Sequence, residues 1–300
     1  MTALLFATIV LAWGFTWFAI KLQLGAVPME VSIFWRFAVA TALLALGLAA
    51  TKRLKPVPLA QHRWLAAMGM CLFTLNFLLI YAATQYIASG VVSVVFTLAT
   101  IFNAFNQWLF LGRRPGPRAL LGGALGITGL ALLFGEELAR IEAGAAAGLG
   151  IGLALLGTYV FSLGNLASLR ATAGGVDLPN AVLRGMGWGT CFLAFYLLVR
   201  GDSFRPALTA IYLGSLAYLA VVGSVVGFLA YLSLVARVGA DRAAYATVLF
   251  PLVALSVSTL LEGYAWTPLA VAGLPLILLG NVVIFARLPR SGIAVGPRSP

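Results

Sequence analysis

The chain has 300 residues, of which 62% are apolar and only 9% are charged, and its mean hydropathy is +1.04. A soluble protein of this length could not cover its surface with so few charges, so the composition excludes soluble classes and predicts a polytopic membrane protein. The net charge of +11 comes from Lys and Arg in short loops rather than from a basic helix, and it does not predict a nucleic-acid partner.

Ten apolar segments follow one another along the sequence, most of them close to the 20 or so residues that a helix needs to cross a bilayer. We predict transmembrane helices over Thr2–Leu22, Val31–Ala50, Trp64–Thr84, Val91–Leu111, Ala119–Gly135, Ala146–Ala167, Leu178–Val199, Ala210–Val235, Ala243–Leu261 and Pro268–Ala286. No basic residue precedes the first segment and another span follows it, so we expect it to be retained rather than cleaved as a signal peptide. The short loops leave no room for a soluble domain, and residues 291–300 are expected to form a disordered tail.

Lys and Arg residues in the loops are distributed unevenly between the two sides of this predicted bundle. One side carries thirteen of them: Lys52, Arg53, Lys55, Arg63, Arg113, Arg114, Arg118, Arg170, Arg237, Arg242, Arg287, Arg290 and Arg298. The other side carries four: Lys21, Arg140, Arg200 and Arg205. Because basic loops stay in the cytoplasm, we expect an integral plasma (inner) membrane protein whose N- and C-termini are both cytoplasmic.

Several features recur at an offset of about 150 residues, which is half the chain. The recurring features are Arg36 with Arg184, Tyr81 with Tyr231, and the spacing Gly122-x6-Gly129 with Gly273-x6-Gly280. A unit of five spans is odd, so its second copy enters the membrane inverted. We therefore predict an all-α fold of two inverted five-helix repeats, residues 1–143 and 144–290. Such repeats are typical of transporters, whose substrate site lies near the midplane between the two halves.

One face of the predicted helix Val91–Leu111 carries the clearest candidate site. Phe96, Thr100, Asn103 and Gln107 lie at i, i+4, i+7 and i+11, so they share that face. Polar groups on an apolar helix turn away from lipid, toward protein or a wet cavity. We expect Phe96, Thr100 and Asn103 to bind substrate.

Polar and aromatic residues of other spans complete the candidate site, each with a structural alternative. Trp13, Thr16 and Trp17 share a face too deep for interfacial anchors, and they either line a cavity or pack between helices. Asn76 either reaches the cavity or bonds a neighbouring helix. The other candidates, on spans six, eight and nine, are Tyr159, Ser162, Asn165, Tyr231 and Tyr245. Hydroxyls in such helices often bond their own backbone or a neighbouring helix.

Three further residues are candidates for gating. Arg36 and Arg184 lie about two turns inside their helices, where they either attract a substrate carboxylate, act in a gate, or bond helix-end carbonyls. Pro251 removes a helix hydrogen bond in the middle of a span and is the expected hinge. No Asp or Glu lies in the middle of a span, so we expect either facilitated transport or a coupling that uses no buried acid.

Motifs in both halves resemble the EamA family of the drug/metabolite transporter superfamily. The first half has Trp13-Gly14, Lys21, Pro28 and Arg36, and the second has Gly239-Ala240-Asp241-Arg242-Ala243-Ala244, Pro251 and Leu261-Glu262. Within this family the chain is most similar to the aromatic amino-acid exporters (YddG-like). The resemblance implies ten helices, cytoplasmic termini and a central cavity lined mainly by spans 1, 3, 4, 6, 8 and 9. The halves differ where Thr100 corresponds to Pro251 and Arg113 to Glu262.

These features together predict a transporter that exports aromatic and other small apolar amino acids by alternating access. Efflux of small organic cations is a close alternative, because aromatic faces attract cations. A lipid flippase or a channel is an alternative of another class, although no charged ring or filter motif is present. We expect no enzyme, metal or cofactor, because the only histidine, His62, lies in a loop. The expected partners are a small-molecule substrate and membrane lipids, with the chain acting as a monomer.

Overall fold

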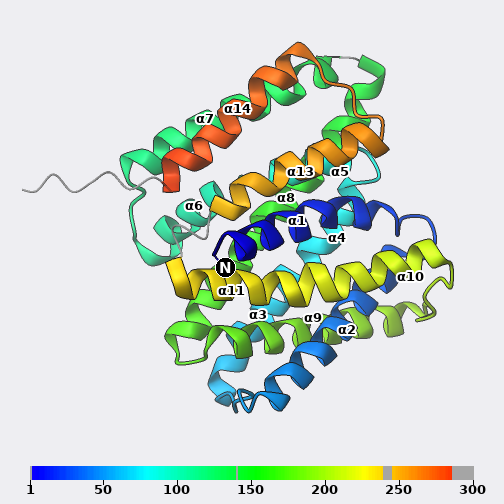
Figure 1. Cartoon of the computed structure of the whole chain (residues 1–300), viewed down its shortest axis with the longest axis vertical. Coiled ribbons are helices and arrows are strands. Elements are labelled where there is room, and N and C mark those ends of the chain that lie inside the picture. The colour runs from blue at the N-terminus through cyan, green and yellow to red at the C-terminus, as the bar shows by residue number, and fades with distance from the viewer. Residues whose placement is uncertain (1, 140, 239–244, 286–300) are drawn as a thin grey trace, which may run out of the picture.

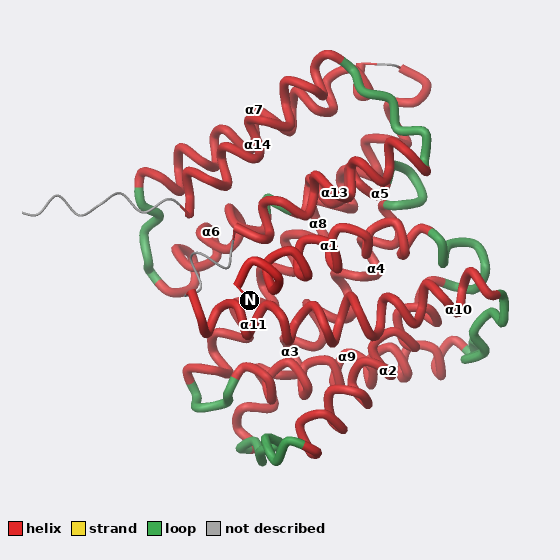
Figure 2. The backbone as a smooth tube through the Cα atoms, viewed as in Figure 1, coloured by secondary structure: helices red, strands yellow, loops and turns green. Residues whose placement is uncertain are grey.

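The computed structural model describes residues 2–139, 141–238 and 245–285, which form helices joined by short loops, with no strand in these ranges (Figures 1 and 2). Eight helical stretches are long and apolar enough to cross a membrane, and two shorter apolar helices, Ala246–Leu261 and Pro268–Ile284, follow them. The prediction of an all-helical membrane protein is therefore confirmed, while the count of ten spans stays a prediction. The expected tail, residues 291–300, lies outside the described residues.

Helices occupy the ten predicted segments in chain order. The first half contains α1 (Thr2–Lys21), α2 (Met29–Ala50), α3 (His62–Met68), α4 (Asn76–Ala83), α5 (Ser89–Phe96), α6 (Ala99–Leu111) and α7 (Pro117–Ala139). The second half contains α8 (Ile141–Ala173), α9 (Leu178–Arg200), α10 (Ala210–Ala217), α11 (Gly227–Val238), α13 (Tyr245–Leu261) and α14 (Pro268–Phe285). A short 3₁₀ turn, Leu59–Gln61, precedes α3.

Local sequence signals set several helix ends. Asp177 caps α9 by accepting a hydrogen bond from the amide of Asn180 (3.2 Å), and Thr209 caps α10 in the same way through Tyr212 (3.3 Å). Helix α6 ends at Gly112, whose φ of 67° is a left-handed conformation that glycine adopts without strain. These polar and glycine positions mark three of the boundaries between the apolar runs.

The predicted helix Val91–Leu111 is broken in the structure, where α5 and α6 are separate. Thr97 and Leu98 form a turn, with backbone amides donating to Val94 and Val95 three residues earlier (both 3.0 Å). The Thr97 hydroxyl also donates to the Val94 carbonyl (2.7 Å). Neither Gly nor Pro occurs at this break, so no conventional sequence signal marks it.

Two predicted α-helices contain π-helical segments, which the sequence did not predict. Gly69–Leu75 joins α3 to α4, and Tyr218–Val226 joins α10 to α11. A hydroxyl lies near the end of each segment and donates to the carbonyl five residues earlier, from Thr74 (3.2 Å) and from Ser224 (2.9 Å). Each π turn moves the following side chains away from the face expected for 3.6 residues per turn.

The packing of the helices places a core around α1. Helix α1 packs against α13 and α11, α2 packs against α9, and the long α8 packs against α3, α4 and α6. Helices α7 and α14 pair with each other at one edge of the molecule (Figure 1). This arrangement leaves a central space between α1, α4, α6, α8 and α11, where the candidate site lies.

Candidate functional site

A cavity of about 640 Å³ lies at the centre of the bundle. Most helices of the bundle contribute side chains to its wall, namely α1 to α6, α8, α9, α11, α13 and α14, with further residues from the π-helical segments. Ten of the sequence-predicted site and gating residues line this cavity: Trp13, Thr16, Trp17, Arg36, Asn76, Phe96, Thr100, Asn103, Asn165 and Tyr231. The structure therefore brings together residues that lie up to 218 positions apart in the sequence, from Trp13 to Tyr231 (231 − 13).

Two predicted binding residues of α8 lie outside this lining. Ser162 accepts a hydrogen bond from the side-chain amide of Asn106 on α6 (2.8 Å) and is buried. The Tyr159 ring packs edge-on against Phe102, also on α6, with 5.5 Å between centroids. Both side chains therefore contact α6 without lining the cavity, whereas Asn165, one turn further along α8, contacts α6 and also reaches the cavity.

Two other predicted residues do not contribute to the described cavity wall either, and the side chain of a third is not described. Arg184 lies in α9 and Pro251 lies inside α13, and neither is among the lining residues. Pro251 does follow Phe250, which lines the cavity. Tyr245 begins α13, and its side chain falls outside the described part of the chain.

Four aromatic rings from four helices form a continuous wall. The Trp17 ring lies 5.3 Å from that of Phe96 and 6.0 Å from that of Phe250, to which it is nearly parallel. Phe96 in turn packs against Phe161, with 4.6 Å between centroids. Such ring pairs bind one another in edge-on or stacked geometry and offer flat apolar faces. The sequence analysis missed Phe161 and Phe250. In an apolar helix, nothing in the sequence distinguishes a phenylalanine that faces a cavity from one that faces lipid.

Amide and hydroxyl groups of α6 and of its neighbours α8 and α14 provide the polar part of the wall. The side-chain amide of Asn165 donates to Asn103 Oδ1 (3.3 Å), which joins α8 to α6. The Thr100 hydroxyl donates to Asn281 Oδ1 on α14 (3.2 Å). All of these groups are neutral, so they can orient a polar substrate group without attracting a particular charge.

Arg36 is the charged residue of the described cavity wall. Its side chain is buried, with an exposed fraction of 3%, and its Nε donates to the Ser224 hydroxyl (3.4 Å). The guanidinium carbon lies 4.4 Å from the centre of the Phe77 ring and 5.3 Å from that of Phe37. These aromatic faces attract a cation and partly replace the water that a charged group loses on burial.

The cavity is closed at one end, which we call the Glu262 end, where α1 and α13 finish and α5 begins. Lining residues near this end, such as Ile20 and Ile80, are buried. Lining residues near the opposite end of the bundle, such as Asn103, Gln107 and Ser168, are partly exposed. The cavity is therefore more accessible from the end at which α1 begins.

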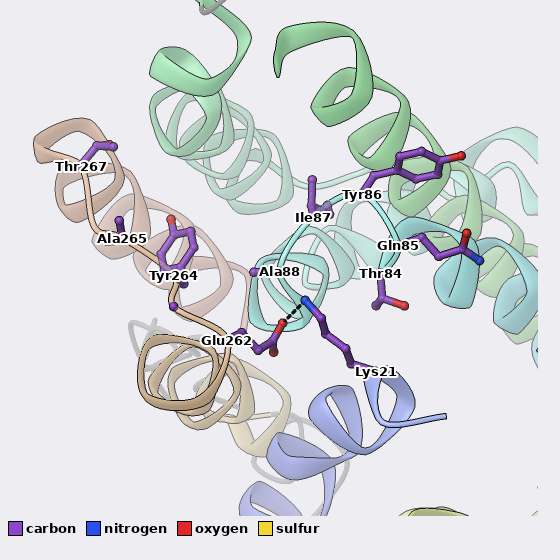
Figure 3. Close-up of a pocket in the computed structure, with 11 residues that line it drawn as sticks. Lys21, Thr84, Gln85, Tyr86, Ile87, Ala88, Glu262, Tyr264, Ala265 and Thr267 are labelled. Carbon is purple, nitrogen blue, oxygen red and sulfur yellow. Dashed lines mark ion pairs between the residues drawn. The ribbon is translucent and has the colours of Figure 1, made fainter. Parts of the chain in front are cut away.

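An ion pair joins the helix ends at the Glu262 end. Lys21 Nζ lies 2.8 Å from Glu262 Oε2, and the Glu262 side chain is only 2% exposed (Figure 3). The same carboxylate accepts hydrogen bonds from the Ser89 amide (3.1 Å), the Ser89 hydroxyl and the Ser258 hydroxyl (2.6 Å). The pair lies in the wall of a pocket of about 380 Å³. Figure 3 shows other residues of this pocket, among them Tyr86. One carboxylate thus connects α1, α5 and α13.

The hydrogen bonds around Glu262 decide its ionisation. Burial by itself would raise the pKa of this carboxyl, but hydrogen bonds from Lys21, Ser258 and Ser89 outweigh burial and hold the pKa below its ordinary value of 4.5. Because the pKa of Glu262 is lowered in the closed arrangement, its carboxylate stabilises that arrangement fully when the pH is above the ordinary pKa. The stabilisation is lost as the pH falls through the lowered pKa. The closure is therefore expected to persist at neutral pH.

Comparison with known proteins identifies the family. The model of the EamA-like transporter family matches residues 1–135 and 148–286. The chain belongs to the EamA-like transporter family. It is thus an integral membrane protein of a transporter family, which fits a helical bundle with a central cavity and does not suggest an enzyme.

Relatives of this EamA family member are themselves described mainly as transporters. The chain is 24% identical to the protein PagO of Salmonella typhimurium, over 88% of this chain and 86% of PagO. It is 27% identical to the uncharacterised transporter YvbV of Bacillus subtilis, over 92% and 89% of the two chains. It is 25% identical to the uncharacterised inner membrane transporter YedA of Escherichia coli K12, over 91% and 86%. None of these names specifies a substrate.

A solved crystal structure supports the fold. It superposes with a TM-score of 0.63 and 16% sequence identity, covering 94% of this chain and 96% of the other. This likeness concerns the fold alone.

Proposed function

We propose that this chain exports aromatic and other small apolar amino acids from the cytoplasm. The observation that carries the proposal is the composition of the central cavity, where four aromatic rings stand beside neutral amides and one buried guanidinium. Aromatic faces suit a flat apolar body, and the polar groups suit the charged end of an amino acid. A volume of about 640 Å³ is within the usual range for small-molecule sites.

The proposed route is alternating access between two inverted halves. Two separate stretches match the family model, and π-helical segments recur at residues 69–75 and 218–226. With both termini in the cytoplasm, as the loop charges predict, the closed Glu262 end faces outward and the cavity accepts substrate from the cytoplasm. The name of the Escherichia coli relative supports placing this chain in the inner membrane. One chain encloses the cavity, so we propose that the monomer transports.

Efflux of small organic cations is the alternative that the aromatic wall also supports. The charged group of the described wall is a guanidinium, and no carboxylate of the described residues lines the cavity. A positive group in a low-dielectric cavity repels a cationic substrate and attracts an anionic or zwitterionic one. The geometry therefore favours amino acids.

Transport by purified protein in liposomes tests the proposal. We expect saturable uptake of labelled phenylalanine and tryptophan, weaker uptake of threonine, and no uptake of the organic dication paraquat. Paraquat transport without amino-acid transport would replace the proposed function by the alternative. Because no described carboxylate lines the cavity, we also expect rates that do not change with an imposed proton or sodium gradient.

Substitution of Pro251 by alanine tests the proposed hinge. Proline lacks the amide that would bond the carbonyl of Thr247, so α13 can bend next to Phe250. Alanine restores that hydrogen bond and stiffens the helix. We expect Pro251→Ala to lower the maximal transport rate several-fold with little change in substrate affinity, as measured by initial rates in liposomes.

Pro275 provides a matched control, because it also lies inside a helix, α14, but neither of its chain neighbours, Leu274 and Leu276, lines the cavity as Phe250 does beside Pro251. Pro275→Ala is expected to transport at the wild-type rate. If Pro251→Ala also transports at the wild-type rate, Pro251 is not the hinge.

A further inference from the structure

Two buried polar atoms in the cavity lack hydrogen-bond partners among the described residues. They are Arg36 Nη1, which is a donor, and Asn76 Oδ1, which is an acceptor. Both side chains line the cavity, with exposed fractions of 3% and 2%. Buried polar atoms are nearly always paired, and an unpaired buried guanidinium is especially unfavourable. One cavity is thus lined by a residue with an unpaired donor and a residue with an unpaired acceptor. This pattern indicates a ligand that offers an acceptor to Arg36 and a donor to Asn76.

The surroundings of Arg36 do not provide the missing negative charge. No ion pair joins Arg36 to a described carboxylate, and its Nε is taken by Ser224. The Tyr81 hydroxyl also interacts with the guanidinium, but it keeps its proton, which it donates to Gln23 Oε1 (2.8 Å), and so it supplies no negative charge. Phe77 covers one face of the guanidinium at 4.4 Å and so compensates the charge only in part.

A glycine packs close beside the guanidinium. A Cβ atom at Gly223 would lie 3.0 Å from the Thr16 hydroxyl and 3.8 Å from Arg36 Nη2. A side chain at this position would therefore crowd two hydrogen-bonding side chains that both line the cavity. A carboxylate in the cavity beside Arg36 could accept hydrogen bonds from the planar guanidinium, whose geometry matches it.

The position of Asn76 completes the pattern. It directly precedes Phe77, the residue whose ring covers the guanidinium, and it lines the same cavity as Arg36. Its Nδ2 donates to the Leu72 carbonyl (3.4 Å), so the atom of this amide that lacks a partner is Oδ1, which accepts hydrogen bonds. An ammonium group is a donor that such an oxygen can bind.

We propose that Arg36 Nη1 binds the carboxylate of the substrate, and that Asn76 Oδ1 accepts a hydrogen bond from the α-ammonium of the same molecule. This inference rests on the proposed function, and it assigns the two charged ends of an amino acid to two residues. It places the carboxylate between α2 and the π-helical segment that carries Ser224, with the substrate side chain against the aromatic wall. Arg36 is then a specificity residue that selects acids and zwitterions against amines.

Three related ligands test this assignment on the wild-type protein without any substitution. L-Phenylalanine carries both groups, 3-phenylpropionate lacks the ammonium and phenethylamine lacks the carboxylate. Affinities are measured by calorimetry on the full chain in detergent. Charged hydrogen bonds of this kind change affinity by about 10- to 100-fold, so we expect phenethylamine to bind at least 10-fold more weakly than phenylalanine. Equal or tighter binding of phenethylamine would overturn the proposal.

Variants then assign the groups to residues. In Arg36→Met the preference for phenylalanine over phenethylamine is expected to fall to about one, whereas Arg36→Lys retains part of it. In Asn76→Ala the preference for phenylalanine over 3-phenylpropionate is expected to fall. Arg184→Met is the matched control, because Arg184 does not line the cavity, and the ratio of affinities is expected to stay at its wild-type value. An unchanged ratio in Arg36→Met contradicts the assignment.

The outcome separates this inference from the broader proposal. If aromatic ligands do not bind but leucine binds in a manner that depends on Arg36, the aromatic preference is wrong and the carboxylate subsite stands. If transport of phenylalanine occurs and the Arg36→Met ratio is unchanged, the subsite is wrong and the exporter stands. If no carboxylate ligand binds the wild-type protein, both are wrong.

Discussion

Glu262→Gln is expected to open the closed end of the cavity. Glutamine cannot neutralise Lys21, and it provides only one oxygen for the donors of Ser89 and Ser258. Removing one member of a fully buried ion pair typically costs about 3–5 kcal/mol, but the charge left here is that of Lys21, whose side chain is 39% exposed, so we expect a smaller cost of about 2 kcal/mol. That energy shifts the balance between closed and open ends by about 30-fold. The substitution therefore favours access from the Glu262 end.

Cysteine labelling measures this change. Ile20 lines the cavity, is 1% exposed and immediately precedes Lys21, so Ile20→Cys reports on the closed end. In a protein whose Cys71 and Cys191 are replaced by alanine, a membrane-impermeant maleimide should react with this cysteine at least tenfold faster when Glu262→Gln is present.

Glu30 supplies the control at the same end of the bundle. It lies 3.8 Å from Arg200, whose side chain is 52% exposed, so this pair contributes little. Glu30→Gln is expected to leave the labelling rate unchanged. Equal labelling of Ile20→Cys with and without Glu262→Gln would mean that the ion pair does not hold this end closed.

The sequence predicted the cavity best where polar residues repeat on a helical face. Phe96, Thr100, Asn103 and Gln107 all line the cavity, although the helix that carries them is broken at Thr97 and Leu98. The break lies after Phe96, and the other three residues follow it on one uninterrupted helix, α6, so their shared face is preserved. A polar side chain in a lipid-facing helix is costly, which makes such a stripe informative even without knowledge of the tertiary structure.

The sequence was less informative about aromatic and hydroxyl residues. Phe161 and Phe250 line the cavity and Tyr159 does not, yet all three belong to helices that carry apolar side chains on every face. Lipid tails and a protein core are equally apolar, so periodicity does not distinguish them. Ser224 was missed for a different reason, because it lies in a π-helical segment where side chains depart from the 3.6-residue period.

The glycines between α7 and α14 connect the sequence repeat to the packing. Gly122 lies against Gly280, and Gly129 lies against Gly273, so the two equally spaced pairs meet in antiparallel fashion. Each glycine brings the backbone of one helix onto the backbone of the other. A side chain at any of the four positions would collide with a backbone carbonyl oxygen of the facing helix. Because that oxygen cannot rotate away as a side chain can, the helices would have to separate.

Gly129→Ala is therefore expected to destabilise the protein strongly. The new Cβ would lie 2.6 Å from the Gly273 carbonyl oxygen and 2.9 Å from the Ile277 amide nitrogen, which is closer than real contacts allow. Relief requires α7 and α14 to move apart and to lose packing along their length, at a cost of about 2–3 kcal/mol. The measurement is the thermal unfolding temperature in detergent, which we expect to fall by several degrees.

Gly123 on the same helix makes the comparison specific. A Cβ there meets only the side chain of Ile101, at 3.7 Å, which is an ordinary van der Waals contact. Gly123→Ala should leave the unfolding temperature unchanged or raise it, because alanine favours a helix by up to about 1 kcal/mol over glycine. If both substitutions change the temperature equally, the loss reflects helix propensity or lipid packing, and the direct backbone contact between α7 and α14 does not stabilise the fold.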